Sequence, residues 1–192
     1  MEVAKKKISI KVNPYIVVVV LCLVVIAISL SNRRSFDDTL DAYIEATMAG
    51  DAEAVVDLLH DSYIESLIDK GEIESRDDLI QRVQNKLDWY ASCAEDLRGE
   101  NGEYFKYVAE LQEVKDEEMD DTLPFHLKSI CGDAIDDLKE AKTVYIFYTC
   151  YFYNTALERN DEREITDEYI YFVKIGHSWY LGEIARYSQF DW

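Results

Sequence analysis

Hydrophobic residues between positions 36 and 98 recur every three to four positions, which is the spacing of amphipathic helices. The pattern predicts three successive helices, over 36–49, over 52–68 and from Ser75 to just before Gly99. Gly50 is suited to end the first helix, and Asp51 can cap the second. The Ser-Arg-Asp-Asp run that begins at Ser75 resembles a capping box with Asp in place of Glu.

After Gly102 the period changes to two, which is typical of strands. The predicted strands cover 105–111, 143–154, 164–175 and 178–184, with turns at 158–163 and 176–177 and a short helical segment at 123–130. Helices followed by strands favour an α+β fold. We expect three helices packed on a curved, cone-like antiparallel sheet of about four strands.

Near the N-terminus, 15–30 is an uncharged apolar run. As a helix it covers about 24 Å, close to the thickness of a bilayer core once the flanking residues are included. Lysines precede it, which favours a cytoplasmic N-terminus. We therefore expect a cytoplasmic segment at 1–14, a transmembrane signal anchor at 15–31, a short stalk at 32–35 and an extracytoplasmic domain at 36–192.

The alternative is a cleaved signal peptide, because Ala27-Ile28-Ser29 offers small residues at a cleavage site. Two arginines directly after the run, Arg33 and Arg34, and its many β-branched residues favour a retained anchor. In the first case the chain is a single-pass protein of the plasma membrane, and in the second it is secreted. Both place the folded domain outside the cytoplasm.

The charge of the chain limits its partners. The net charge is −19, with 39 acidic against 20 basic residues, and the acidic residues lie almost entirely after position 34. Nucleic-acid binding requires clustered lysine and arginine, so nucleic acid is excluded as a partner. A hydrophobic content of 48% with few Gly and Pro indicates a folded domain rather than a disordered chain.

The order of elements resembles the cystatin-like, nuclear transport factor 2-like superfamily, and in particular its small exported bacterial domains. Three stretches carry the resemblance: the helix, Gly-Asp, helix opening over 43–59, the tyrosine-rich strand pair, and Gly-His-Ser-Trp-Tyr-Leu at 176–181. The resemblance implies a curved sheet that wraps a long helix. Enzymatic members place an acid or a His-Asp pair in an apolar pocket, but no motif here matches those residues one by one, and fold alone does not transmit activity.

The histidines and acidic runs offer weak candidates for chemistry. His60 with Asp57 or Asp61 is the least improbable acid/base pair. His126 and His177 stand without a second ligand at metal-binding spacing. The acidic residues at 116–118, 120 and 121 lack the pattern of an EF-hand loop, so we predict a solvated loop, no metal site and no cofactor.

The odd number of cysteines in the predicted domain leaves two states open. Cys93, Cys131 and Cys150 allow one disulfide, of Cys93 with either of the others, or three free thiols.

Aromatic residues are frequent on both faces of the predicted strands. Because successive strand residues point to opposite sides, one set must face the helices and the other a partner, a pocket or solvent. The candidate ligand- or partner-binding residues are Tyr145, Phe147, Tyr151, Tyr153, Tyr169 and Tyr171. We therefore expect a membrane-anchored binding domain of the bacterial cell envelope that takes a small apolar ligand or a neighbouring envelope protein. The alternatives are an isomerase- or dehydratase-like enzyme with a pocket acid/base and a structural component of envelope or secretion assemblies.

Overall fold

The computed structural model describes residues 33–119 and 131–182. The chain divides into two compact units, Met1–Arg33 and Arg34–Trp192, and the elements below belong to the second. They form an α+β fold with a four-stranded antiparallel sheet in the order β1-β2-β3-β4, which confirms the predicted class. Within the described ranges no helix combines the length and apolar character needed to cross a bilayer, and the predicted span 15–31 lies outside them.

In the part of the chain that the structure describes, four helices precede the sheet. They are α2 (Phe36–Ala49), α3 (Ala52–Val56), α4 (Asp61–Asp69) and α5 (Arg76–Asn101). The first begins with a capping box in which Ser35 and Asp38 bond to each other's backbone N–H, and it ends at Gly50 in the left-handed conformation (φ 70°). At the start of α5, Ser75 accepts from the Asp78 N–H, but the Asp78 carboxylate accepts from the Glu74 N–H instead of completing the predicted box.

The predicted helix over 52–68 is wrong, because the chain leaves the helix after Val56. Leu58 and Leu59 are both buried, and their backbone meets the end of the sheet. The Leu58 carbonyl accepts from the Leu181 N–H at 2.8 Å, and Leu59 forms an isolated bridge to the same residue. Pairing with the sheet therefore replaces about one turn of helix, and α4 starts afresh with His60 as its N-cap.

The strands are β1 (Gly102–Asp116), β2 (Leu138–Asn154), β3 (Arg159–Ile175) and β4 (Ser178–Leu181), with a 3₁₀ helix, η1 (Gly132–Asp137), before β2. The first three are longer than predicted, because polar residues at their ends still pair across the ladder. The predicted turn at 158–163 is instead confined to 155–158, and β3 begins at Arg159. The turn at Gly176-His177 is confirmed. The predicted helical segment at 123–130 lies outside the described residues.

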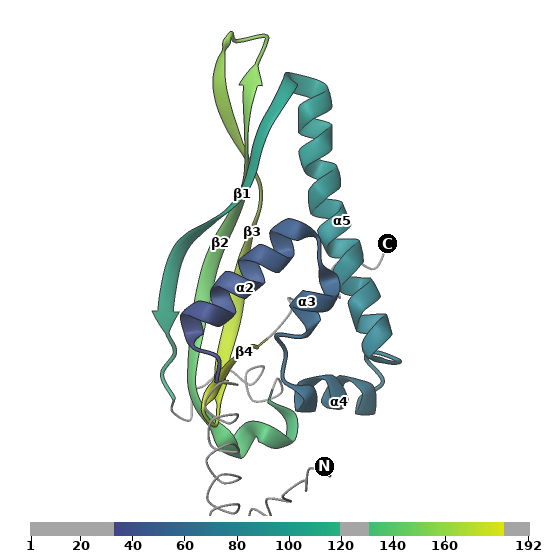
Figure 1. The fold of residues 1–192 in the computed structure, drawn as a ribbon, viewed down its shortest axis with the longest axis vertical. Coiled ribbons are helices and arrows are strands. Elements are labelled where there is room, and N and C mark those ends of the chain that lie inside the picture. Colours follow the sequence, from purple (N-terminus) through teal and green to yellow (C-terminus); the bar gives the residue numbers. More distant parts are fainter. Residues whose placement is uncertain (1–32, 120–130, 183–192) are drawn as a thin grey trace, which may run out of the picture. The chain divides into compact units, whose positions relative to one another are not determined.

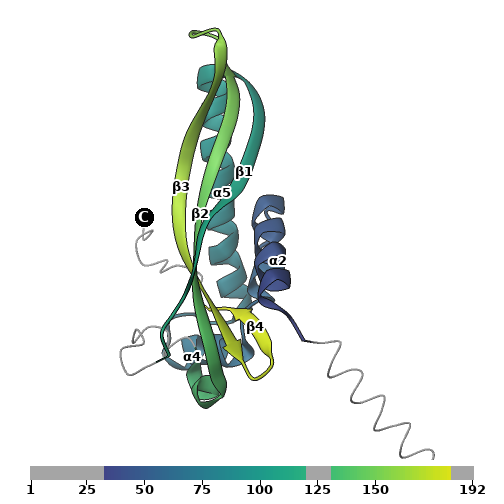
Figure 2. The ribbon, with the colours of Figure 1, turned by 90° about the vertical axis from the view of Figure 1, so that its left-hand side faces the viewer.

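Helices α2 and α5 lie on one side of the sheet, and α5 runs along its length (Figures 1 and 2). The main core forms where helix residues such as Leu40 and Val83 meet Val144, Ile146 and Phe172 of the sheet. We call the side of the sheet that faces these helices the inner face and the opposite side the outer face. A smaller cluster, of Cys131, Ala141, Val173 and Ile175, packs with η1 at the end of the sheet where β2 begins and β3 ends.

Candidate functional site

The alternation of β2 divides its aromatic residues between the two faces. Tyr148 and Phe152 are buried in the inner face, together with Val144, Ile146 and Cys150. The other parity carries Tyr145, Phe147, Tyr151 and Tyr153, which are half-buried or exposed. The predicted set therefore shares the outer face, as its spacing requires.

Cross-strand pairing adds residues of β3 to this set. Tyr145 lies directly opposite Tyr169, and their rings stack with centroids 4.3 Å apart and planes 11° from parallel. Phe147 meets the Tyr145 ring edge-on at 4.9 Å. The side chain of Tyr169 is 60% exposed, so the stacked pair presents an aromatic surface to solvent.

Tyr171 differs from the other predicted residues. It has the same parity as Tyr169 but is half-buried against the small cluster around Val173, at the end of the sheet where η1 packs. Core packing therefore accounts for Tyr171, and the candidate surface is best represented by the five other aromatic residues.

Two tyrosines of the outer face donate hydrogen bonds to carboxylates. The Tyr145 hydroxyl donates to Asp167 at 2.7 Å, and the Tyr151 hydroxyl donates to Glu110 at 2.5 Å. The hydrogen bond to Asp167 raises the pKa of Tyr145 well above its usual value, and the bond to Glu110 raises the pKa of Tyr151 to about 12. These bonds orient the rings, and they keep both phenols protonated to a higher pH than an ordinary tyrosine.

The inner face holds a polar cluster that sequence analysis missed. Glu168 of β3 is buried and forms an ion pair with Lys86 of α5. The Tyr43 hydroxyl donates to the same carboxylate at 3.1 Å, and the Tyr90 hydroxyl donates at 2.5 Å. We call these four residues, with Tyr148, the inner polar cluster.

Tyr148 completes the cluster from β2. Its hydroxyl lies 3.4 Å from the Tyr43 hydroxyl, and its ring packs against Tyr90 with centroids 4.9 Å apart. Burial, followed by the neighbouring Tyr43 and Glu168, raises the pKa of Tyr148 well above its usual value. Both oxygens of the Glu168 carboxylate accept hydrogen bonds, so a costly buried charge is compensated by donors from two helices, α2 and α5.

A signal for this cluster exists in the sequence. Glu168 occupies the parity of Ile170 and Phe172, so a period-two pattern places a carboxylate on an apolar face. On α5, Lys86 lies beside Val83, Leu87 and Tyr90, all of which are buried. One charge of each sign, each at a core position, indicates a buried ion pair.

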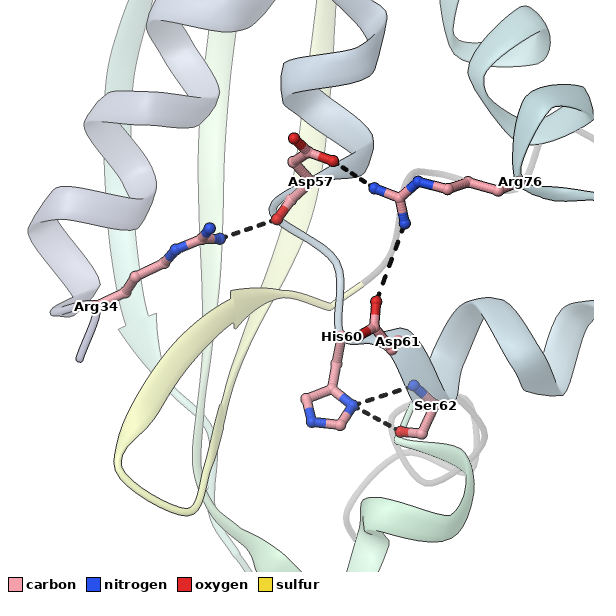
Figure 3. Close-up of polar contacts among 6 residues, drawn as sticks. All are labelled: Arg34, Asp57, His60, Asp61, Ser62 and Arg76. Atoms are coloured by element: carbon pink, nitrogen blue, oxygen red, sulfur yellow. Dashed lines mark hydrogen bonds and ion pairs between the residues drawn. The ribbon is translucent and has the colours of Figure 1, made fainter. Parts of the chain in front are cut away.

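His60 does not pair with either predicted aspartate. The carboxylates of Asp57 and Asp61 both face Arg76, whereas the His60 ring turns toward Ser62 (Figure 3). Its Nδ1 accepts from the Ser62 N–H at 3.2 Å and lies 2.7 Å from the Ser62 hydroxyl oxygen. The ring therefore caps α4 and packs edge-on against Tyr180, which is a structural role.

The acidic run and the other histidines were also weak candidates for acid/base chemistry or metal binding. The described members of this group have structural or solvent-exposed positions. Asp116 pairs with Lys142, and Glu117 accepts from the Thr143 hydroxyl. His177 is exposed in the turn before β4. Within 33–119 and 131–182 no cluster of three or more metal-ligating side chains occurs. His126, Asp120 and Asp121 fall outside these ranges.

The structure has Cys93, Cys131 and Cys150 as free thiols, which is one of the two states that the sequence left open. Cys131 and Cys150 are buried, and burial raises the pKa of each thiol to about 11. Burial also raises the pKa of Cys93. Thiols with raised pKa values are poor nucleophiles at neutral pH, because the thiolate is the reactive form.

Comparison of the chain with models of protein families, with curated proteins and with solved structures finds no match.

The inner polar cluster predicts a specific pattern of stability. Lys86→Met should destabilise the fold by about 3–5 kcal/mol, because it leaves the Glu168 carboxylate buried without its cation. Adding Glu168→Gln, which removes the charge but keeps an acceptor for the tyrosines, should recover much of that loss. Urea unfolding of the full chain in uncharged detergent measures both values. Equal destabilisation of the single and double variants would show that the ion pair is not what links these elements.

The bond between Tyr151 and Glu110 predicts a site-specific titration. Because folding raises the pKa of Tyr151, this bond stabilises the fold below pH 10 and loses that effect as the pH rises toward 12. Glu110→Ala should lower the pKa of Tyr151 toward 10, whereas Glu53→Ala on α3 should leave it unchanged. Ring-¹³C tyrosine NMR across this pH range reads the value. An unchanged pKa of Tyr151 in the Glu110 variant would show that the bond to Glu110 does not raise it.

Proposed function

We propose that residues 36–192 form a membrane-anchored extracytoplasmic domain of the bacterial cell envelope that binds a partner protein through its outer face. The basic N-terminus, the apolar run at 15–30 and the acidic remainder of the chain support this location. The antiparallel sheet packed with helices on its inner face supports a cone-like, nuclear transport factor 2-like fold.

One observation carries the proposed function. The stack of Tyr145 with the exposed Tyr169 lies beside Phe147, and Tyr151 and Tyr153 continue the same face farther along β2. Aromatic residues are enriched in protein interfaces because they bury a large area at a small cost in side-chain entropy. The rings are held in place by their stack and by the bond to Asp167, so little order is lost on binding. Such a preorganised exposed aromatic surface suits a macromolecular partner better than a small apolar ligand, which requires enclosure.

The inner polar cluster favours binding over catalysis. A general acid or base needs a free lone pair or proton directed at a substrate. Both oxygens of Glu168 instead accept from Tyr43, Tyr90 and Lys86, which fasten α2 and α5 to the sheet. The cluster therefore holds the fold together, and the outer face is left for recognition.

Photo-crosslinking in cells of the source organism tests the proposal. The photoreactive residue p-benzoylphenylalanine replaces Tyr153 or Tyr169 on the outer face, and Trp89 of α5 in the control. Trp89 and Tyr153 are matched aromatic positions, since each is 39% exposed. Both outer positions should crosslink to the same protein, and position 89 should not.

The result is read together with a disruptive variant. Tyr153→Ser with Tyr169→Ser should abolish the association while the unfolding midpoint changes little, because both side chains are exposed. Crosslinks to a second copy of the chain would show that the outer face binds the protein itself rather than a different partner. That result would favour the alternative of a structural component of an envelope or secretion assembly. No crosslink at either outer position, or equal crosslinking at position 89, would overturn the proposed function.

A further inference from the structure

The aromatic residues of the outer face are surrounded by carboxylates. Directly opposed residues on neighbouring strands share a face, so the register places Glu113 beside Tyr145, Asp167 and Glu110 beside Phe147, and Glu162 beside Tyr151. Glu164 joins them opposite Thr149. In the described part of this face, these acids outnumber the amines, which come from Lys106 and Lys115 of the edge strand β1.

The hydrogen bonds of this face leave its negative charge in place. Asp167 accepts from the Tyr145 hydroxyl, and Glu110 accepts from the Tyr151 hydroxyl. A neutral phenol orients a carboxylate but adds no positive charge to balance it. The face therefore offers rigid anionic acceptors directly beside exposed aromatic rings.

Aromatic rings flanked by carboxylates match the chemistry of arginine. A guanidinium group stacks on a tyrosine ring and donates a pair of hydrogen bonds to a neighbouring carboxylate. Tyr169 exposes its ring two residues from Asp167 on the same face, which places both contacts within reach of one side chain. A neutral apolar surface would instead bury these carboxylates without partners, at a cost in desolvation.

The length of the face indicates the form of the partner. From Tyr145 to Tyr153 the strand extends by roughly 26 Å, at about 3.3 Å per residue. The carboxylates are spread along this length rather than gathered at one point. A single small cation would meet only one of them, whereas an extended polypeptide of about eight residues would meet several.

We infer that the partner segment taken by the outer face is an extended, arginine-bearing basic stretch of polypeptide. The inference rests on the interaction surface proposed above and defines the chemistry of its partner. Guanidinium groups of the segment stack on Tyr169 and on the neighbouring rings, and they pair with Asp167 and Glu110.

Fluorescence anisotropy with a labelled nonapeptide of alternating Arg and Ser tests the inference on the full chain in uncharged detergent. The test variant, Asp167→Asn with Glu110→Gln, removes two charges but keeps an acceptor for each tyrosine hydroxyl. The control, Asp41→Asn with Glu45→Gln, removes two charges from exposed positions of α2. A Glu-Ser nonapeptide controls for the sign of the probe's charge.

The test variant should bind the basic peptide roughly tenfold or more weakly, because charge-assisted hydrogen bonds are lost. The control should change the affinity less than about twofold, and Tyr169→Ser should weaken binding as the test variant does. Rising salt should reduce the affinity of the unmodified chain. Equal weakening in test and control variants would show attraction by net charge alone and would overturn the inference.

Failure of the inference is distinguishable from failure of the proposed function. Crosslinks from positions 153 and 169 to a partner segment without arginine or lysine, together with unchanged peptide affinity in the test variant, would overturn the basic partner and leave the binding surface standing. Loss of the crosslinks themselves would overturn the surface and the inference together.

Discussion

The buried ion pair between Lys86 and Glu168 is the interaction on which the arrangement of the domain depends. It joins α5 to β3, and the hydroxyl of Tyr43 brings α2 to the same carboxylate. A buried charge without partners costs several kcal/mol, so these elements have to assemble together. The pair also fixes which side of the sheet faces the helices, because a one-residue slip would bring Tyr169 inside and expose Glu168.

Hydrogen bonds from a tyrosine hydroxyl to a carboxylate occur on both faces of the sheet, and they have a different role on each face. On the inner face, Tyr43 and Tyr90 donate to a buried carboxylate and link helices to the sheet. On the outer face, Tyr145 donates to the exposed Asp167, and this bond orients a ring that is available to a partner. The inner bonds hold α2 and α5 on one face of the sheet, which leaves the outer aromatic residues for recognition.

Local patterns predicted much of the fold, while contacts between distant segments account for what they missed. The helix over 36–49 and the alternation of β2 follow from periodicity, because each depends on neighbours in sequence. The break after Val56 depends on pairing with Leu181, which local periodicity cannot register. The inner polar cluster likewise requires Lys86 and Glu168 to meet across 82 positions of sequence, although each is anomalous at its own core position. The membrane anchor and the binding role stay predictions.

The central claim is that the outer tyrosines recognise a partner and the inner tyrosines hold the fold. Ring-¹³C tyrosine NMR of the full chain, recorded with and without the Arg-Ser nonapeptide, tests it most directly because both sets are observed in one spectrum. The account predicts that the signals of Tyr145, Tyr151 and Tyr169 shift on titration while those of Tyr43, Tyr90 and Tyr148 stay unchanged. Shifts confined to the inner set would contradict the account and would place ligand binding within the core.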